Sequence, residues 1–161
     1  MSLRQKPWNR TDHPLYSISV TDESGTNMNL VSYVSAVSMK PKRFAVAVYK
    51  NTRTLSMLLR QKTFVLQLLS ERQFVLARLL GKTSGFRIDK LRSLQRKKAL
   101  DNWEGHPVLC EALALMELKQ IRHLDAGDHV LFLCEVIRWK NRNEGNPLTL
   151  SILSEKKIIS V

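Results

Sequence analysis

The apolar runs of this 161-residue chain are all short, and their length is what most restricts its fold. The longest, such as residues 44–49 and 130–134, have the length of single β-strands. None approaches the ~20 apolar residues that a membrane-spanning helix needs. Hydrophobic residues still make up 43% of the chain, which is enough to form a buried core. We therefore expect one globular domain, built mainly from strands, with no membrane partner.

The order of predicted elements contains no strand–helix–strand alternation. Residues 28–39 are expected to form two short strands or one bent strand, and further strands are predicted at residues 15–20, 44–49, 64–69, 112–121, 129–139, 148–153 and 157–161. The strand at 44–49 is apolar on both faces, which predicts a central position. Thr54 is a candidate N-cap for a helix at 55–60, and Ser70 with Gln73 resembles a capping box for a helix at 71–80. This pattern favours an antiparallel β-barrel with peripheral helices.

Positive charge is concentrated in two parts of the chain, which has a net charge of +12. No acidic residue lies between Glu23 and Glu71, although that span holds Lys40, Lys42, Arg43, Lys50, Arg53, Arg60 and Lys62. A second basic block, residues 82–98, contains Asp89 as its only acidic residue. Such regions attract nucleic acid, an acidic membrane surface or a phosphate-bearing small molecule, and charge alone does not choose among them. The second block has two open explanations, a clamp for dinucleotide phosphates and a solvated surface.

Several common sites are excluded by missing residues. Gly81-Lys82-Thr83 imitates the end of a phosphate-binding P-loop, but Leu76 stands where the motif needs glycine. GxGxxG, HExxH and GxSxG are absent, so we expect neither a Rossmann site, a metal site nor a hydrolase triad. Cys110 and Cys134 form no CxxC pair and lie in apolar stretches, which predicts buried, reduced thiols in a cytoplasmic protein. Aromatic residues make up 7% and are not interleaved with the basic block, so no RNA-stacking surface is visible.

The first residues are expected to form a separate arm. Residues 1–11 are polar and basic and lack the apolar stretch of a secretory signal. The remaining residues, 12–161, are expected to form the folded domain.

Several segments match one family pattern in order from residue 27 to residue 148. Residues 27–41 read Asn-Met-Asn-Leu-Val-Ser-Tyr-Val-Ser-Ala-Val-Ser-Met-Lys-Pro and precede an apolar strand and the polar loop 50–54. Residues 64–70 read Phe-Val-Leu-Gln-Leu-Leu-Ser, and Gly-Asp-His at 127–129 opens a later apolar strand. Together these segments resemble the flavin reductase-like, FMN-binding split-barrel family. The resemblance implies a mainly β fold with peripheral helices, an antiparallel split β-barrel that binds FMN, with FAD as the alternative cofactor.

The chain departs from this family pattern at three places. Many members have Thr-Ala or a similar pair where this chain has Leu30-Val31, and a paired proline where it has Lys40-Pro41. Gln67 stands in place of the family's asparagine. FMN binding should survive the first two changes if the backbone supplies the contacts.

The resemblance places FMN between residues 29–35 and the loop 50–54. The flat ring would be held, mostly through the main chain, by Asn29, Leu30, Val31 and Ser32. Hydroxyls, amides and positive charge for the phosphate would come from Ser35, Lys50, Asn51, Thr52 and Thr54. The alternatives are that residues 28–39 are plain strand, that Thr54 is only a cap, and that Lys50 is only a surface lysine.

The resemblance also implies the chemistry. His129 would lie at the exposed flavin face, where NAD(P)H docks as co-substrate and transfers hydride from nicotinamide C4 to flavin N5. The competing explanation is a histidine held by a neighbouring carbonyl. The expected protein is a cytoplasmic homodimer acting as an NAD(P)H-dependent flavin reductase, with a monooxygenase as the partner that receives reduced flavin. The alternative is a non-catalytic basic barrel that binds nucleic acid or an anionic surface through a degenerate flavin site.

Overall fold

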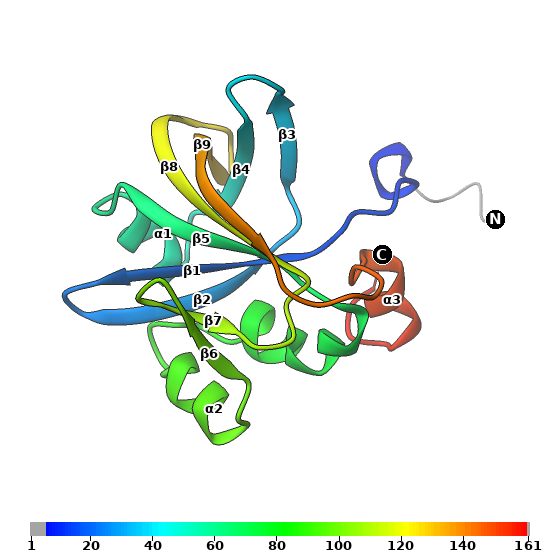
Figure 1. Ribbon diagram of the computed structural model, residues 1–161. Coiled ribbons are helices and arrows are strands. Elements are labelled where there is room, and N and C mark those ends of the chain that lie inside the picture. The colour runs from blue at the N-terminus through cyan, green and yellow to red at the C-terminus, as the bar shows by residue number, and fades with distance from the viewer. Residues whose placement is uncertain (1–5, 161) are drawn as a thin grey trace.

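Seven strands form one antiparallel sheet in the order β2-β1-β5-β8-β9-β4-β3, and the sheet curls into a split barrel (Figure 1). The computed structural model describes residues 6–160. The strands are β1 (Tyr16–Asp22), β2 (Gly25–Val31), β3 (Val34–Ser38), β4 (Arg43–Tyr49), β5 (Thr63–Leu68), β8 (Ala114–Asp125) and β9 (His129–Asn141). The two edge strands, β2 and β3, are consecutive in the chain. The split of the barrel therefore lies where the chain passes from β2 to β3.

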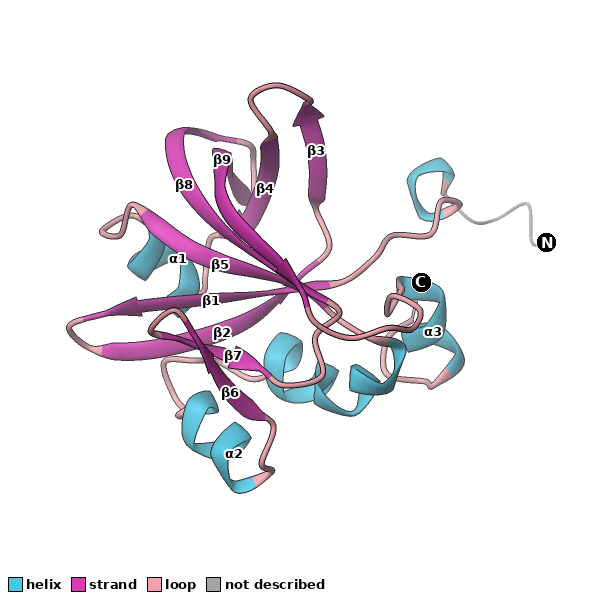
Figure 2. Cartoon of the chain, viewed as in Figure 1, coloured by secondary structure: helices cyan, strands magenta, loops and turns pink. Residues whose placement is uncertain are grey.

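Helical elements and a small hairpin lie around the sheet, as Figure 2 shows. They are η1 (Pro7–Asn9), α1 (Arg53–Leu58), η2 (Glu71–Leu76), η3 (Arg78–Lys82), α2 (Lys90–Arg96), α3 (Leu150–Glu155) and the hairpin of β6 (Leu100–Trp103) with β7 (His106–Leu109). Within residues 6–160 no helix has the length and apolar character that crossing a membrane requires. Of the predicted N-terminal arm, residues 1–5 lie outside the described part of the chain, and η1 occupies half of the remaining residues 6–11.

The buried side chains form two cores on opposite faces of the sheet region. The first fills the barrel and includes Ile18, Val46, Phe64, Leu66 and Phe132, all of which are inaccessible to solvent. The second joins the sheet to the helices and includes Met28, Leu69, Leu80, Leu94 and Leu109. The barrel core therefore fixes β4 and β9, while the second core fixes the segment that covers β2.

The predicted burial is confirmed for one of the two cysteines. Cys134 is buried in the barrel core, and this burial raises the pKa of its thiol to about 12. Cys110 is partly exposed, and its Sγ lies 3.8 Å from the carbonyl oxygen of Lys98. Both thiols are free.

The sequence predictions are confirmed for the central strands and wrong at the C-terminal end. Residues 148–153 were expected to form a strand, but Leu150–Glu155 is the helix α3, capped by Thr149, whose hydroxyl accepts a hydrogen bond from the Ile152 N–H. No strand forms over residues 157–160, and residue 161 lies outside the described chain. Six apolar-rich residues match strand and helix patterns equally, and the Thr149 cap decides for the helix.

Two further predictions are corrected by the burial pattern and the helix type. On β4, Val46 and Val48 point into the barrel, but Ala45 and Ala47 remain half-exposed, so only one face of this strand is covered. The single helix expected at residues 71–80 is instead a 3₁₀ helix, η2, followed by a π-helical turn, η3. The predicted cap is present, since the Gln73 Oε1 accepts a hydrogen bond from the Ser70 N–H at 3.0 Å.

Candidate functional site

The predicted ring-binding segment runs along the edge strand β2 and into its link to β3. Among the described strands β2 pairs only with β1, so its outer edge is free of strand pairing. Asn29 and Leu30 are half-buried there, and Val31 is buried. Ser32 and Tyr33 form the link, where the Tyr33 carbonyl accepts a hydrogen bond from the Ala47 N–H at 2.9 Å. The structure therefore places residues 29–32 at the edge of the sheet and in the link that follows it.

The loop after β4 is organised by Thr52, and the prediction that Thr54 caps α1 is wrong. The Thr52 hydroxyl donates to the Tyr49 carbonyl at 2.8 Å and accepts from the Leu55 N–H at 3.2 Å. Thr54 is inaccessible to solvent, and its Oγ1 accepts a hydrogen bond from the Asn27 Nδ2 at 2.9 Å. Thr54 thus ties the loop to β2, and its side chain is covered in this structure.

Lys50 connects the same loop to the turn between β8 and β9. Its ammonium lies 2.5 Å from the Asp125 Oδ2, and its backbone N–H donates to the Asp128 carbonyl at 3.0 Å. The hydrogen bond from Lys50 holds the pKa of Asp125 below its usual value. Asn51, the next residue, is exposed. The charge of Lys50 is therefore at the surface of the site but already has a carboxylate partner.

His129 begins β9 and lies in a small aromatic cluster. Its Nδ1 is 2.6 Å from the Asp128 Oδ1, so a carboxylate, not the neighbouring carbonyl of the competing explanation, holds the ring. The His129 ring centroid lies 5.0 Å from that of Tyr33 and 5.5 Å from that of Tyr49. Tyr49 is also the residue paired with His129 across β4 and β9.

Sequence reasoning missed Tyr33 and Tyr49 as members of the site. Both residues remain exposed, by 59% and 46%, so their rings are accessible to a ligand. No sequence signal identifies them, because their contact with His129 depends on the register between β3, β4 and β9. The tyrosines join the β2–β3 link, the loop after β4 and the start of β9 into one rim.

The remaining predicted residues lie away from the centre of this rim. Ser35 is exposed on the edge strand β3, where its hydroxyl donates to the Ala36 carbonyl at 3.3 Å. Gln67 is buried in β5, and its Oε1 accepts from the Leu109 N–H at 2.6 Å. Gln67, which stands where the family has asparagine, is thus accommodated by a buried hydrogen bond between β5 and β7.

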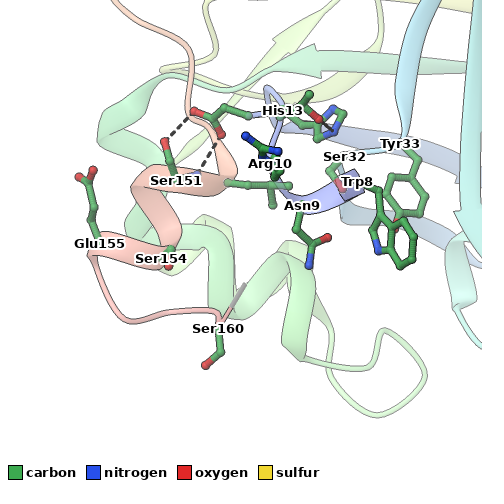
Figure 3. Close-up of a pocket in the computed structure, with 13 residues that line it drawn as sticks. Trp8, Asn9, Arg10, His13, Ser32, Tyr33, Ser151, Ser154, Glu155 and Ser160 are labelled. Carbon is green, nitrogen blue, oxygen red and sulfur yellow. Dashed lines mark hydrogen bonds between the residues drawn. The ribbon is translucent and has the colours of Figure 1, made fainter. Parts of the chain in front are cut away.

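A cavity of about 790 Å³ shares Ser32 and Tyr33 with this rim (Figure 3). It lies between the N-terminal segment and α3, and Trp8 stands next to Tyr33 at its mouth. Asp12 closes the far side by accepting hydrogen bonds from the N–H and the hydroxyl of Ser151 at 3.0 and 2.6 Å. The volume is in the range of small-molecule sites.

The donor set of the rim fits a flat heteroaromatic ring with an anionic tail. The edge of β2 has no strand partner, so its backbone has donors for an acceptor-rich ring edge. The Thr52 hydroxyl already donates to Tyr49 and Thr54 is covered, which leaves Lys50 and Asn51 as the loop residues for a phosphate. The charge of Lys50 is shared with Asp125, so a phosphate would compete with that carboxylate for the ammonium. Among residues 6–160, no three histidine, cysteine or acidic side chains are close enough to hold a metal ion.

Comparisons with known proteins agree with this geometry. Residues 8–152 match the flavin reductase like domain. A relative named "Putative diflavin flavoprotein A 3", from Nostoc sp. (strain PCC 7120), is 30% identical over 125 residues, which cover 77% of this chain and 21% of the relative. The chain thus spans about a fifth of the length of the curated relatives it matches.

Two solved structures share the fold. The FMN-binding protein from Thermus thermophilus has a TM-score of 0.76 at 23% identity, covering 91% of this chain and 83% of that one. BorF, the flavin reductase component of a bacterial two-component tryptophan halogenase, has a TM-score of 0.76 at 19% identity, covering 88% of each chain. Because the family model covers most of the described residues, this chain belongs to the flavin reductase-like domain family.

Proposed function

We propose that this chain binds FMN along β2 and at the rim formed by the β2–β3 link, the loop after β4 and the start of β9, and reduces it with NAD(P)H. The observation that supports this most strongly is the position of His129. Its ring contacts the Asp128 carboxylate and the rings of Tyr33 and Tyr49, and Tyr33 directly follows the predicted ring-binding residues 29–32 in the chain. A histidine at an exposed rim, with one ring nitrogen bonded to a carboxylate, is suited to orient a ligand.

The chemistry follows from what each group can do. Bound FMN would supply the redox step, accepting at N5 the hydride that leaves nicotinamide C4 with both bonding electrons. With Asp128 facing Nδ1, the other ring nitrogen of His129, Nε2, faces away from that carboxylate and can hydrogen-bond the nicotinamide carboxamide or the reduced flavin. The open edge of β2 would hold the flavin ring in place, and the loop after β4 would bind its phosphate.

A direct assay separates this function from the alternative of a non-catalytic basic barrel. Purified protein is mixed with FMN and either NADH or NADPH, and the loss of the reduced-nicotinamide absorbance is followed. The proposal expects FMN-dependent oxidation of at least one of the two nucleotides. A protein that is inactive and colourless, but retained by nucleic acid in a salt-dependent way, would support the alternative.

Lys50→Ala is expected to weaken FMN binding about tenfold and leave riboflavin binding unchanged, because only FMN carries the phosphate. A charge-assisted hydrogen bond contributes about 1.5–3 kcal/mol, and we take the lower end for an exposed lysine. Both ligands are titrated into the protein by fluorescence quenching. Asp125→Asn is the matched control, since it removes the ion-pair partner but keeps the Lys50 charge, and FMN should bind it at least as tightly as the unmodified protein. Equal losses for the two ligands in Lys50→Ala would remove Lys50 from the site.

We also propose that the chain forms a homodimer through the outer face of β4 and β9. The cross-strand pairs Ala45–Leu133 and Ala47–Leu131 are apolar and only half-buried. On the same face, the next pair is Tyr49–His129, so a second copy seated there would stand beside the candidate site.

Leu131→Glu is expected to convert the dimer to a monomer, because it places a charge in the centre of this face. Light scattering on the purified protein measures the change. Val75→Glu, which adds the same charge to an exposed apolar position on η2, is the control and should leave the dimer intact. A wild-type protein that is monomeric at all concentrations, or a Leu131→Glu protein that is as dimeric as the wild type, would contradict the proposed interface.

Further parts of the proposal concern partners and location. BorF is named as a component of a two-component halogenase system, which supports a role for this chain in supplying reduced flavin to a partner monooxygenase. The two free cysteines support a reducing, cytoplasmic location.

A further inference from the structure

Lys90 is a buried lysine within an otherwise exposed basic segment. It is the first residue of α2, and only 2% of its surface is accessible. Its Nζ donates to the Leu80 carbonyl at 2.8 Å and to the Asn29 Oδ1 at 3.1 Å. One side chain therefore joins α2, η3 and the edge strand β2.

The chain approaches β2 closely enough for this contact because glycines stand at two points of the intervening segment. A Cβ atom at Gly81 would lie 3.0 Å from the Leu30 Cδ2, and one at Gly85 would lie 2.5 Å from the Asn27 Oδ1. The Asn27 side chain is itself hydrogen-bonded to Thr54, so moving it away would break that buried hydrogen bond. The segment from η3 to α2 is thus seated directly against the residues that lead to Asn29.

The ammonium of Lys90 has no carboxylate partner among the described residues. Asp89, its neighbour in sequence, uses its Oδ1 to accept the Arg92 N–H at 3.0 Å. Burial lowers the pKa of Lys90 to about 8, so the charged form still predominates at neutral pH. An ammonium has three N–H donors, and two are occupied by neutral oxygens. Keeping an uncompensated charge buried is costly, so its retention calls for an explanation beyond packing.

We propose that Lys90 is a positioning residue of the flavin site, which orients the Asn29 side chain and places a positive charge behind the edge of β2. FMN with a reduced, anionic ring would then bind more tightly than FMN with an oxidised, uncharged ring. This inference rests on the proposed function. The reduced isoalloxazine ring ionises near neutral pH and carries its negative charge on the pyrimidine side, which residues 29–32 would hold. Because Lys90 is buried and has no counterion among the described residues, its charge is poorly screened by water and favours an anionic form of a ring nearby.

The test compares FMN binding in both redox states for Lys90→Met, which keeps an unbranched side chain one atom shorter and removes the charge. The dissociation constants of oxidised and reduced FMN are measured under anaerobic conditions, and the apoprotein melting temperature verifies folding. We expect reduced FMN to bind about tenfold more weakly and oxidised FMN to change less than about twofold. A tenfold difference lowers the two-electron midpoint potential of bound flavin by about 30 mV. Lys90→Arg should restore most of the preference, because it keeps the charge.

Arg92→Met is the matched control, because it removes one charge from an exposed position of the same helix. It should leave the ratio of the two dissociation constants unchanged. Equal losses for both redox states in Lys90→Met, no loss in either, or the same selective loss in Arg92→Met would overturn the role of Lys90. If Lys90→Met does not fold, Lys90→Gln, which is also uncharged, is measured in its place against the same criteria. A wild-type protein that binds FMN in neither state would instead overturn the proposed function itself.

Discussion

Replacing His129 by alanine is expected to slow NAD(P)H oxidation by about 100-fold while changing the FMN dissociation constant by less than about threefold. His129 contacts Asp128 and the two tyrosine rings at the proposed flavin site. Loss of the His129 side chain would leave the nicotinamide poorly oriented, while the residues proposed to bind FMN would still be present. Misplacement of reacting groups by about 1 Å costs on the order of 10²-fold in rate. Steady-state oxidation of NADH and NADPH, together with FMN titration by fluorescence quenching, measures the two effects separately.

His123→Ala is the matched control, since His123 lies on β8 with its ring 5.4 Å from Phe132, outside the rim. This variant should oxidise NAD(P)H at nearly the wild-type rate. If His129→Ala loses rate and FMN affinity to the same extent, or loses neither, then His129 does not have the role assigned to it.

Phe132→Ala is expected to lower the free energy of unfolding by about 3–5 kcal/mol, the usual cost of removing a fully buried phenylalanine. Phe132 is inaccessible in the barrel core and pairs with Val46 on β4, so its loss leaves a cavity beneath the strands that carry Tyr49 and His129. Because domains of this size have stabilities of about 5–15 kcal/mol, the loss is a large share of the total. Denaturant unfolding monitored by circular dichroism measures it.

The control for this variant is Ile137→Ala, at a position of the same strand that is 47% exposed. We expect a change within about 0.5 kcal/mol, as for most surface substitutions. Similar costs at the two positions would show that the barrel core does not hold β9 in the way the structure indicates.

Long strands with clear flanking turns could be predicted from sequence, and short ambiguous segments could not. The strands at β4, β5, β8 and β9 follow from apolar runs bounded by polar turns, and the barrel follows from their order. The error at Leu150–Glu155 arose because the apolar positions of six residues satisfy both periods. The sequence also could not predict which face of β4 is exposed, because the pattern of apolar residues does not distinguish Ala45 and Ala47 from core residues.

The parts of the candidate site that follow from local sequence could be predicted, and the parts that depend on contacts between distant residues could not. Thr52 and Thr54 are both suitable caps by composition, and only the contact of Thr54 with Asn27 distinguishes them. Lys90 belongs to the basic block 82–98, for which the sequence leaves open a phosphate clamp and a solvated surface. A helix would place it on one face with Leu94, four residues later, and the structure buries both. That spacing is the signal that could have identified it.

Titration of the apoprotein with FMN and riboflavin tests the central claim most directly. Fluorescence quenching is followed at two salt concentrations, since a phosphate contact should weaken as salt is added. We predict one saturable site per chain, with FMN binding more tightly than riboflavin and the difference shrinking at high salt. Absence of saturable quenching, or equal affinity for the two ligands at both salt concentrations, would contradict a phosphate-binding flavin site at this rim.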